Sequence, residues 1–327
     1  MFAVTFRRHR VAALFAAVLA GGLLAGCGDS DGGGGGAAAE ESGGVVKLKV
    51  GVTPVGDFAP LYYAKDKGIF TKNGLDVTID PKGASEVPPL VSNSYQAVSM
   101  SWTTFIQATA QGVGLRGVFP GIDGAPDTQT GIYAMPSSGI GSAKDLEGKT
   151  VAVNQPKATF ELNSRVALKE AGVDVDKVKF QVLPLSVMGD ALVSGKVDAA
   201  YLVPPFSTQV QDKDAKLLVD PYEKTLKGMP VAGYVMTDTF VKENPKAAKA
   251  FVAALTEAAD ELNKNDSYRD FVTTYTKLTP ELAQQVPNYT FPTAIDVAKL
   301  QEEADLMAQE GFATKKVDIA SLLLDAR

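Results

Sequence analysis

The side chains best suited to covalent or metal chemistry lie at one end of this chain. Its only cysteine is Cys27 and its only histidine is His9, so neither type occurs after residue 27. The rest of the chain therefore cannot build a Ser-His or Cys-His nucleophile pair, a histidine general base, or a histidine or cysteine metal site. Without further cysteines it also cannot form disulfides, so packing must stabilise the fold. Carboxylate and lysine chemistry remain possible.

The first candidate binding group is the loop 54–58, which follows an expected strand. This loop leads into a helix, and the partial positive charge at a helix N-terminus favours an anion or a carbonyl oxygen. The carboxylate of Asp57 opposes that preference and would instead hold an amine or a ring N–H. Alternatively, Asp57 only caps the helix that begins at Ala59, because aspartate is a preferred N-cap residue. We include Phe58 among the candidate ligand contacts.

A second candidate group ends the expected strand at 97–100. Ser101 and Thr103 place hydroxyls on either side of Trp102, the only tryptophan. Hydroxyls at a helix N-terminus can donate to a sulfonate, a carboxylate or a heterocycle oxygen, and an indole can form a flat wall. In the alternative interpretation, Ser101 or Thr103 caps the helix and Trp102 fills the core. We favour ligand contact for all three.

A third group lies between an expected strand and helix, in the segment 154–161. Asn154 and Thr159 would clasp a polar group of the ligand. Phe160 would stack on it, and Glu161 would pair a cation. An ordinary capped loop is the alternative.

The end of a further strand supplies the last candidates. Three residues at this strand end would line the same cleft or, equally, pack the hinge: Tyr201, Val203 and Pro204. Acidic residues recur at these strand edges: Asp57, Asp123, Asp127 and Glu161. Several carboxylates would repel a simple anion, whereas a desolvated cation needs such a partner. The sequence therefore favours a nitrogen-bearing solute over nitrate.

Alternating strands and helices must position these groups. The first part of the chain has expected strands at 47–53, 75–79, 97–100 and 115–119, with helices at 59–67 and 102–111. A second unit repeats the order, with strands at 150–153, 179–183 and 199–203 and helices at 158–171 and 189–194. Both units share a Leu-Val-Ser helix end, at 90–92 and 192–194, before an expected central strand. This order predicts two α/β lobes, each a parallel sheet covered by helices.

The last hundred residues decide how the lobes connect. We expect a strand at 231–237, followed by helices at 245–263, 280–286, 292–310 and 316–325. If that strand returns to the first lobe, the chain crosses between the lobes twice, which creates a hinge beside an interlobe cleft. The expected division is lobe 1 at 46–135 plus 232–327 and lobe 2 at 136–231.

The first 45 residues are expected to lie outside this fold. Three arginines at positions 7, 8 and 10 precede an apolar run at 11–24 that is short for a membrane-spanning helix. With Leu24-Ala25-Gly26-Cys27, the segment resembles the precursors of bacterial lipoproteins. The resemblance implies a signal peptide at 1–26 and a lipid on Cys27 that anchors the protein outside the cytoplasm; an uncleaved anchor is the alternative. Residues 27–45 form a glycine-rich tether that has too few apolar side chains to fold.

The charge balance of the mature chain bears on its partners. Removing residues 1–26 removes three arginines and leaves 29 basic and 38 acidic residues, a formal charge of −9. This balance argues against nucleic acid, because binding to phosphates needs a basic face.

Several motifs, in order, resemble one group of binding proteins. They lie at 58–70 (FAPLYYAKDKGIF), 73–77 (NGLDV), 145–153 (DLEGKTVAV), 191–198 (ALVSGKVD), 204–205 (PP) and 240–245 (FVKENP). Together they are similar to the solute-binding proteins for nitrate, sulfonates, taurine and thiamin-pyrimidine precursors, over nearly all of residues 46–270. One departure is NSYQ at 93–96, where the family usually has a glycine and an aspartate.

The resemblance implies a type II periplasmic-binding fold that captures a small solute and delivers it to an ABC permease in the membrane. The solute would be a sulfonate, a taurine-like zwitterion or a pyrimidine-type heterocycle, bound by a monomer without cofactor, metal or enzymatic activity. A pyrimidine synthase of the wider family uses its own histidine and cysteines, which this chain lacks. Two other classes remain open: an exported enzyme with paired carboxylates in the cleft, as in glycosidases, and a scaffolding lipoprotein.

Overall fold

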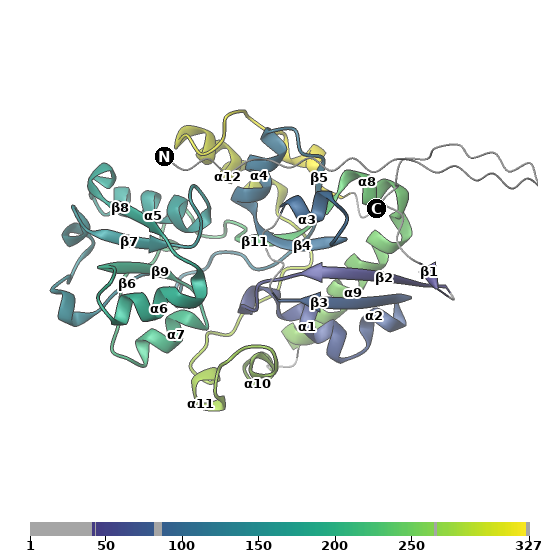
Figure 1. Ribbon diagram of the computed structural model, residues 1–327, viewed down its shortest axis with the longest axis horizontal. Helices are drawn as coiled ribbons and strands as arrows, with labels where there is room; N and C mark the ends of the chain where they lie inside the picture. The colour runs from purple at the N-terminus through teal and green to yellow at the C-terminus, as the bar shows by residue number, and fades with distance from the viewer. Residues whose placement is uncertain (1–40, 43, 82–86, 265–266, 325–327) are drawn as a thin grey trace, which may run out of the picture. The chain divides into compact units, whose positions relative to one another are not determined.

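The computed structural model describes residues 41–42, 44–81, 87–264 and 267–324. The predicted signal peptide, the lipidation site Cys27 and all but a few residues of the predicted tether lie outside these described residues. Within the described part, the strands form two separate sheets (Figure 1).

The first sheet contains β1 (Glu41–Ser42), β2 (Val45–Gly51), β3 (Leu75–Asp80), β4 (Ala97–Ser101), β5 (Leu115–Pro120) and β11 (Ala232–Thr237). β2 pairs in parallel with β3 and with β4, as the βαβ order predicts. β11 pairs antiparallel with both β4 and β5, which confirms that the strand expected at 231–237 returns to the first unit. Its insertion separates β4 from β5, so this part of the sheet is mixed rather than parallel. The short β1 falls within the predicted tether and pairs with the start of β2.

The second sheet has the order β10–β6–β9–β7–β8. The strands expected here are β7 (Thr150–Val153), β8 (Lys179–Val182) and β9 (Ala199–Leu202), and they pair in parallel. β6 (Gly131–Ala134) and β10 (Lys216–Val219) were not expected; they are antiparallel strands of four residues, too short for a clear period-two pattern. β6 thus joins the second sheet, although the expected division placed residues up to 135 in the first lobe.

The repeated Leu-Val-Ser phrase occupies equivalent places in the two sheets. Its first copy ends α3 (Val87–Val91) and leads to β4, which lies between β2 and β11. The second copy ends α6 (Leu185–Val193) and leads to β9, which lies between β6 and β7. Each strand is interior to its sheet, as the sequence predicted.

Two segments of chain, 121–130 and 220–231, connect the sheets, and they pair with each other. The backbone N–H of Gly124 donates to the carbonyl of Met229 at 2.8 Å, and that of Val231 donates to the carbonyl of Ile122 at 3.0 Å. The predicted double crossing is therefore present, and its two segments are hydrogen-bonded to each other rather than independent.

The helices of the first unit include α1 (Ala59–Asp66), α2 (Ile69–Lys72), α4 (Trp102–Ala110), α8 (Asp238–Glu243) and α9 (Pro245–Lys264). In the second unit, α5 (Thr159–Glu170), α6 and α7 (Phe206–Gln211) flank the sheet (Figure 1). Near the C-terminus lie α10 (Tyr268–Phe271), α11 (Pro280–Ala283) and α12 (Val297–Gln309). The helix expected at 316–325 is instead a single 3-10 turn, Ile319–Leu322. Further 3-10 turns occur at Gly56–Phe58, Pro136–Ser138, Ala143–Leu146, Val175–Lys177 and Val272–Thr274.

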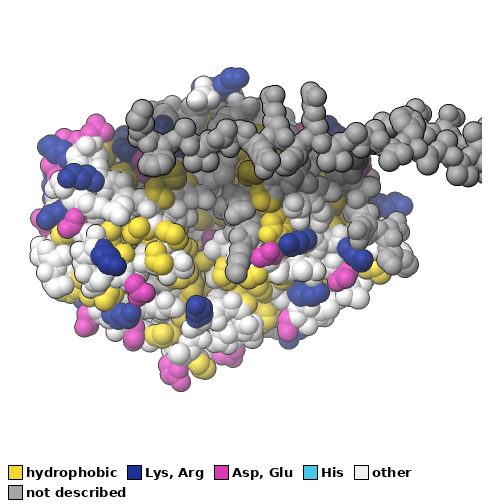
Figure 2. All heavy atoms as spheres, in the orientation of Figure 1, with side chains coloured by type: hydrophobic (Ala, Val, Ile, Leu, Met, Phe, Trp, Pro, Cys, Tyr) yellow, Lys and Arg dark blue, Asp and Glu magenta, His cyan; other side chains and the backbone are white. Residues whose placement is uncertain are grey.

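α9 shows how the apolar pattern determines packing. The residues on its predicted apolar face are buried, apart from the partly buried Val252: Ala248, Phe251, Leu255, Ala258, Ala259 and Leu262. The Phe251 ring lies parallel to Phe70 and edge-on to Tyr234, which joins the helix to α2 and β11. In the part of the chain that the structure describes, no helix has both the length and the apolarity needed to cross a membrane. Figure 2 shows basic side chains interspersed with acidic ones on the face in view.

Candidate ligand-binding site

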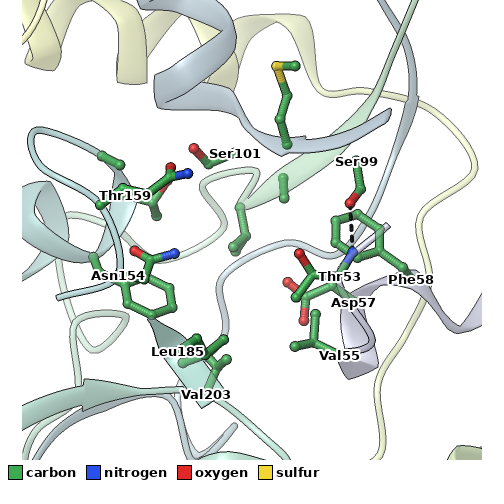
Figure 3. Close-up of a pocket in the computed structure, with 16 residues that line it drawn as sticks. Thr53, Val55, Asp57, Phe58, Ser99, Ser101, Asn154, Thr159, Leu185 and Val203 are labelled. Atoms are coloured by element: carbon green, nitrogen blue, oxygen red, sulfur yellow. Dashed lines mark hydrogen bonds between the residues drawn. The ribbon is translucent and has the colours of Figure 1, made fainter. Parts of the chain in front are cut away.

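A pocket of about 580 Å³, part of it open to solvent, is lined by residues of both sheets and their helices. The first sheet contributes the loop after β2, the end of β4 and the start of β11. The second contributes the segments after β7, β8 and β9 (Figure 3). The lining residues are Thr53, Val55, Asp57, Phe58, Ser99, Met100, Ser101, Asn154, Gln155, Ala158, Thr159, Phe160, Leu185, Val203, Val231 and Ala232.

Asp57 is the one ionisable side chain among these described lining residues. It lies in the 3-10 turn Gly56–Phe58, and the N-cap position of α1 belongs to Phe58, without a side-chain cap. The alternative in which Asp57 caps this helix therefore does not hold. The residue is only 8% exposed. Burial raises the pKa of its carboxyl to about 6, although a hydrogen bond from its own backbone N–H partly offsets this effect.

The hydroxyl side chains at the end of β4 have two roles: one caps a helix and lines the pocket, and the other connects two helices. Ser101 lines the pocket and also caps α4, since its Oγ accepts from the backbone N–H of Thr104 at 3.3 Å. Thr103 is completely buried and does not line the pocket. Its hydroxyl lies 2.9 Å from that of Ser101 and 3.0 Å from that of Thr159, so it connects α4 to α5. Ser101 therefore caps the helix and also lines the pocket, where a ligand contact stays a prediction.

Trp102 lies away from the pocket, in the core of the first unit. It is completely buried and its ring meets Phe105 edge-on, with 5.5 Å between the ring centroids. The indole lies against Gly233 of β11, where a Cβ atom would approach it to 2.2 Å. The predicted flat wall of the pocket is therefore not formed by this side chain; the aromatic residues that line the pocket are Phe58 and Phe160.

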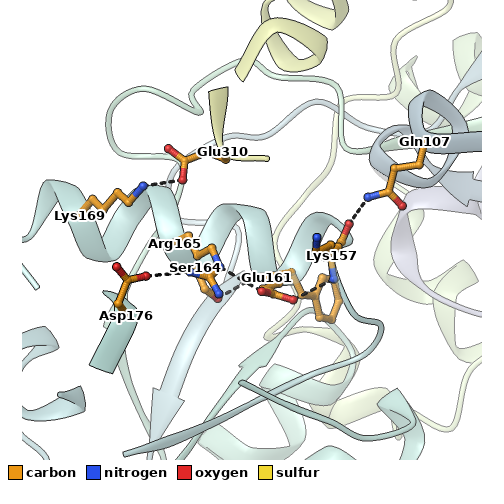
Figure 4. Close-up of polar contacts among 9 residues, drawn as sticks. Gln107, Lys157, Glu161, Ser164, Arg165, Lys169, Asp176 and Glu310 are labelled. Atoms are coloured by element: carbon orange, nitrogen blue, oxygen red, sulfur yellow. Dashed lines mark hydrogen bonds and ion pairs between the residues drawn. The ribbon is translucent and has the colours of Figure 1, made fainter. Parts of the chain in front are cut away.

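Of the four candidate residues in the segment 154–161, three line the pocket and one does not. Asn154, Thr159 and Phe160 line it, and Asn154 Oδ1 is buried without a hydrogen-bond partner in the described structure. Glu161 faces elsewhere: it accepts from the backbone N–H of Lys157 at 2.8 Å and pairs with Arg165 at 3.0 Å (Figure 4). The cation that Glu161 pairs with therefore comes from the protein itself.

Tyr201 and Pro204 do not line the pocket. The ring of Tyr201 packs on Phe160, with centroids 4.5 Å apart, and its hydroxyl accepts from Asn163 at 3.1 Å. Pro204 follows the lining residue Val203 and is joined to Pro205 by a cis peptide bond, but it does not line the pocket. Tyr201 therefore supports the lining residue Phe160 without forming the wall itself.

Most of the lining residues that the sequence analysis missed follow from topology. Thr53 and Leu185 lie just beyond β2 and β8, so the strand-end rule applied to every strand would have found them. Val231 and Ala232 lie at the start of β11. Because β11 runs antiparallel to β4, pairing Ala232 with Ser101, its first residues meet the ends of its neighbours. Only the sheet order reveals this.

The other acids at strand edges lie outside this pocket. Asp123 lines a different cavity, beside Tyr289, where burial and the nearby Asp296 raise its pKa. Among the described residues, no group of three or more His, Cys, Asp or Glu side chains is placed to hold a metal ion.

Comparison with solved structures establishes the fold. The alkanesulfonate-binding protein SsuA from Xanthomonas axonopodis pv. citri superposes with a TM-score of 0.73 at 18% identity, covering 85% of this chain and 98% of that one. The ligand-binding component of an ABC-type import system from Staphylococcus aureus gives a TM-score of 0.68 at 14% identity, covering 84% and 98%. The chain therefore has the two-lobed α/β fold of the periplasmic binding proteins, as predicted.

The matches to curated relatives cover a smaller share of those proteins. The nitrate/nitrite binding protein NrtA of Nostoc sp. is 21% identical over 246 residues, which is 68% of this chain and 55% of that protein. The chain spans between about half and two thirds of the length of the curated relatives that it matches. The model of the family described as NMT1/THI5 like matches residues 55–267, and the chain belongs to this family.

Proposed function

We propose that this protein is an extracytoplasmic solute-binding protein of an ABC import system. It captures a small polar solute between its lobes and delivers it, chemically unchanged, to a permease in the membrane. One observation carries this proposal: a single pocket receives side chains from both of the separate sheets, and two paired segments of chain connect these sheets. A solute that touches both walls stabilises the arrangement in which the walls are close.

The names of the relatives support an import role and give a range of solutes. They include binding proteins for sulfonates and for nitrate and a component of an ABC-type import system. For this chain we propose a sulfonate, a taurine-like zwitterion or a pyrimidine-type heterocycle. We place the lobe boundaries within the crossings, at 121–130 and 220–231, because sheet membership changes there.

The anchor is the second part of the proposal. A lipid on Cys27 and a tether at 27–45 would hold the protein, as a monomer, at the outer face of the cell membrane beside the permease. The Cys27→Ser variant is then released from the membrane fraction, whereas wild type is not. Wild type in the soluble fraction would contradict the anchor.

Capture without turnover is tested on the purified protein. Small molecules released by denaturation are identified by mass spectrometry, and each one is added back while solution scattering measures the radius of gyration. We expect a released compound to be recovered intact and to reduce the radius. A cleaved product would favour the carboxylate-dependent enzyme, and the absence of any bound or binding small molecule would favour a scaffold.

A further inference from the structure

We propose that the solute carries a cationic nitrogen and that Asp57 binds it. This inference rests on the proposed solute-binding function and narrows the class of solute. It departs from the nitrate and simple alkanesulfonates that the names of the relatives suggest, because those ions carry only negative charge.

The charges of the pocket carry the argument. Asp57 is nine-tenths buried, and no lysine or arginine is among the described residues that line the pocket with it. On the opposite wall, the basic residues nearest in sequence to the lining segment 154–160 are Lys157 and Arg165. Lys157 is exposed, and Arg165 is paired with Glu161. An anion without a cationic part would therefore be desolvated beside a carboxylate, with no opposite charge on the wall to compensate.

A second acceptor lies on the other side of the pocket. Asn154 Oδ1 is buried and has no partner in the described structure, whereas the Oγ of Ser99 already accepts from the backbone N–H of Thr53 at 3.2 Å. Figure 3 shows Asp57 and Asn154 on opposite walls, with Leu185 and Val203 near Asn154. Buried acceptors are normally satisfied by donors, so we expect an N–H or O–H group of the solute to donate to Asn154 Oδ1.

The remaining walls set the shape of the solute. Phe58, Phe160, Leu185 and Val203 offer apolar surface, which suits a compact carbon skeleton or a ring. At the start of α5, Thr159 lines the pocket and the helix has no side-chain cap. This end leaves backbone N–H groups to accommodate an acidic group. A simple organic cation and a zwitterion both carry the cationic nitrogen that would pair with the Asp57 carboxylate.

The test uses compounds that differ only in the cationic nitrogen. Affinities of the full chain are measured by calorimetry for taurine against ethanesulfonate and for propylamine against propanol, together with nitrate and every compound released from the purified protein. We expect binding only among compounds that carry a cationic nitrogen. Preference for taurine indicates a zwitterion, and preference for propylamine indicates a simple cation.

Substitution at Asp57 then tests the role of this side chain. We expect Asp57→Asn to weaken the preferred compound at least tenfold, and the exposed Asp190→Asn to leave its affinity unchanged. Tight binding of ethanesulfonate or nitrate, or a preferred compound whose affinity is unaffected by Asp57→Asn, would overturn the inference while leaving the import function intact. If no small molecule of any class binds or is released, both proposals fail.

Discussion

At the scale of single residues, the buried carboxylate of Asp57 lowers the stability of the fold and is also the group that we propose binds the solute. The carboxyl of Asp57 has a pKa of about 6 in the folded protein, against 3.8 for an ordinary exposed aspartate, so it is harder to ionise when the protein is folded than when it is unfolded. Folding therefore favours the protonated form of Asp57. At pH values where this carboxyl is ionised, the protein without solute has a lower free energy of unfolding. A cation in the pocket would remove this penalty.

Asp57→Asn should stabilise the protein in the absence of solute. Because the folded pKa is raised, the stability that Asp57 contributes is fully present below about pH 4 and is lost as the pH rises through 6. The variant should exceed wild type by about 1 to 3 kcal/mol at pH 7.5 and match it near pH 3.5. Urea unfolding across this range measures the difference. Exposed Asp190→Asn is the control, and a difference that does not change with pH would contradict the expectation.

The residue types were a good guide to the pocket where they followed parallel strands, and a poorer one elsewhere. Asp57 and Asn154 lie just beyond the ends of β2 and β7, and both line the pocket. Trp102 also follows a strand, but its side chain turns into the core, where its large apolar ring is fully buried. Position along the chain gives the end of the sheet at which a residue lies; the direction of its side chain depends on packing that the sequence does not show.

At the scale of elements, β11 explains both Trp102 and the pocket residues that were missed. This strand lies between β4 and β5, and the indole fills the space above its Gly233. The sequence predicted the strand because a short apolar run is a local signal, and it left the return of this strand to the first unit as a possibility. Its place in the sheet depends on pairing between residues more than one hundred positions apart, which no local pattern encodes.

Gly233→Ala should therefore destabilise the first sheet. The added Cβ would lie 2.2 Å from the Trp102 ring and 2.6 Å from the Phe119 carbonyl oxygen, and the backbone atom cannot move without disturbing the pairing of β11 with β5. We expect a loss of about 1 to 3 kcal/mol, as for overpacked cores. Gly141→Ala is the matched control, since its Cβ would meet nothing within 4 Å. Equal unfolding midpoints for the two variants would show that the contact relaxes freely.

At the scale of the whole described fold, contacts beside the pocket link its two walls. Thr103 of α4 bonds to Thr159 of α5, and Lys169 of α5 pairs with Glu310 after α12 (Figure 4). The paired segments 121–130 and 220–231 connect the two units at a different place in the chain. The two-lobed plan was predictable because the βα order and the Leu-Val-Ser phrase repeat. These bridging contacts were not, because they join single polar side chains from segments far apart in sequence.

Gln107 offers a test of these contacts that leaves the pocket lining unchanged. Its amide donates to the backbone carbonyls of Lys157, on the second unit, and Phe312, after α12. Gln107→Ala removes both bonds, so the arrangement with the walls close loses stability and the solute should leave faster. A net loss of about 0.5 to 1.5 kcal/mol would weaken affinity roughly 2- to 12-fold, mainly through the dissociation rate.

The control is Gln111→Ala, at the exposed C-terminal end of the same helix. Stopped-flow dissociation of the solute identified by mass spectrometry compares both variants with wild type, and solution scattering follows the radius of gyration of the solute-bound form. Faster release in Gln107→Ala alone, with a larger bound radius, is the expected result. If the two variants release the solute at the wild-type rate, the contacts beside the pocket do not contribute to holding its walls together, and the solute itself bridges them.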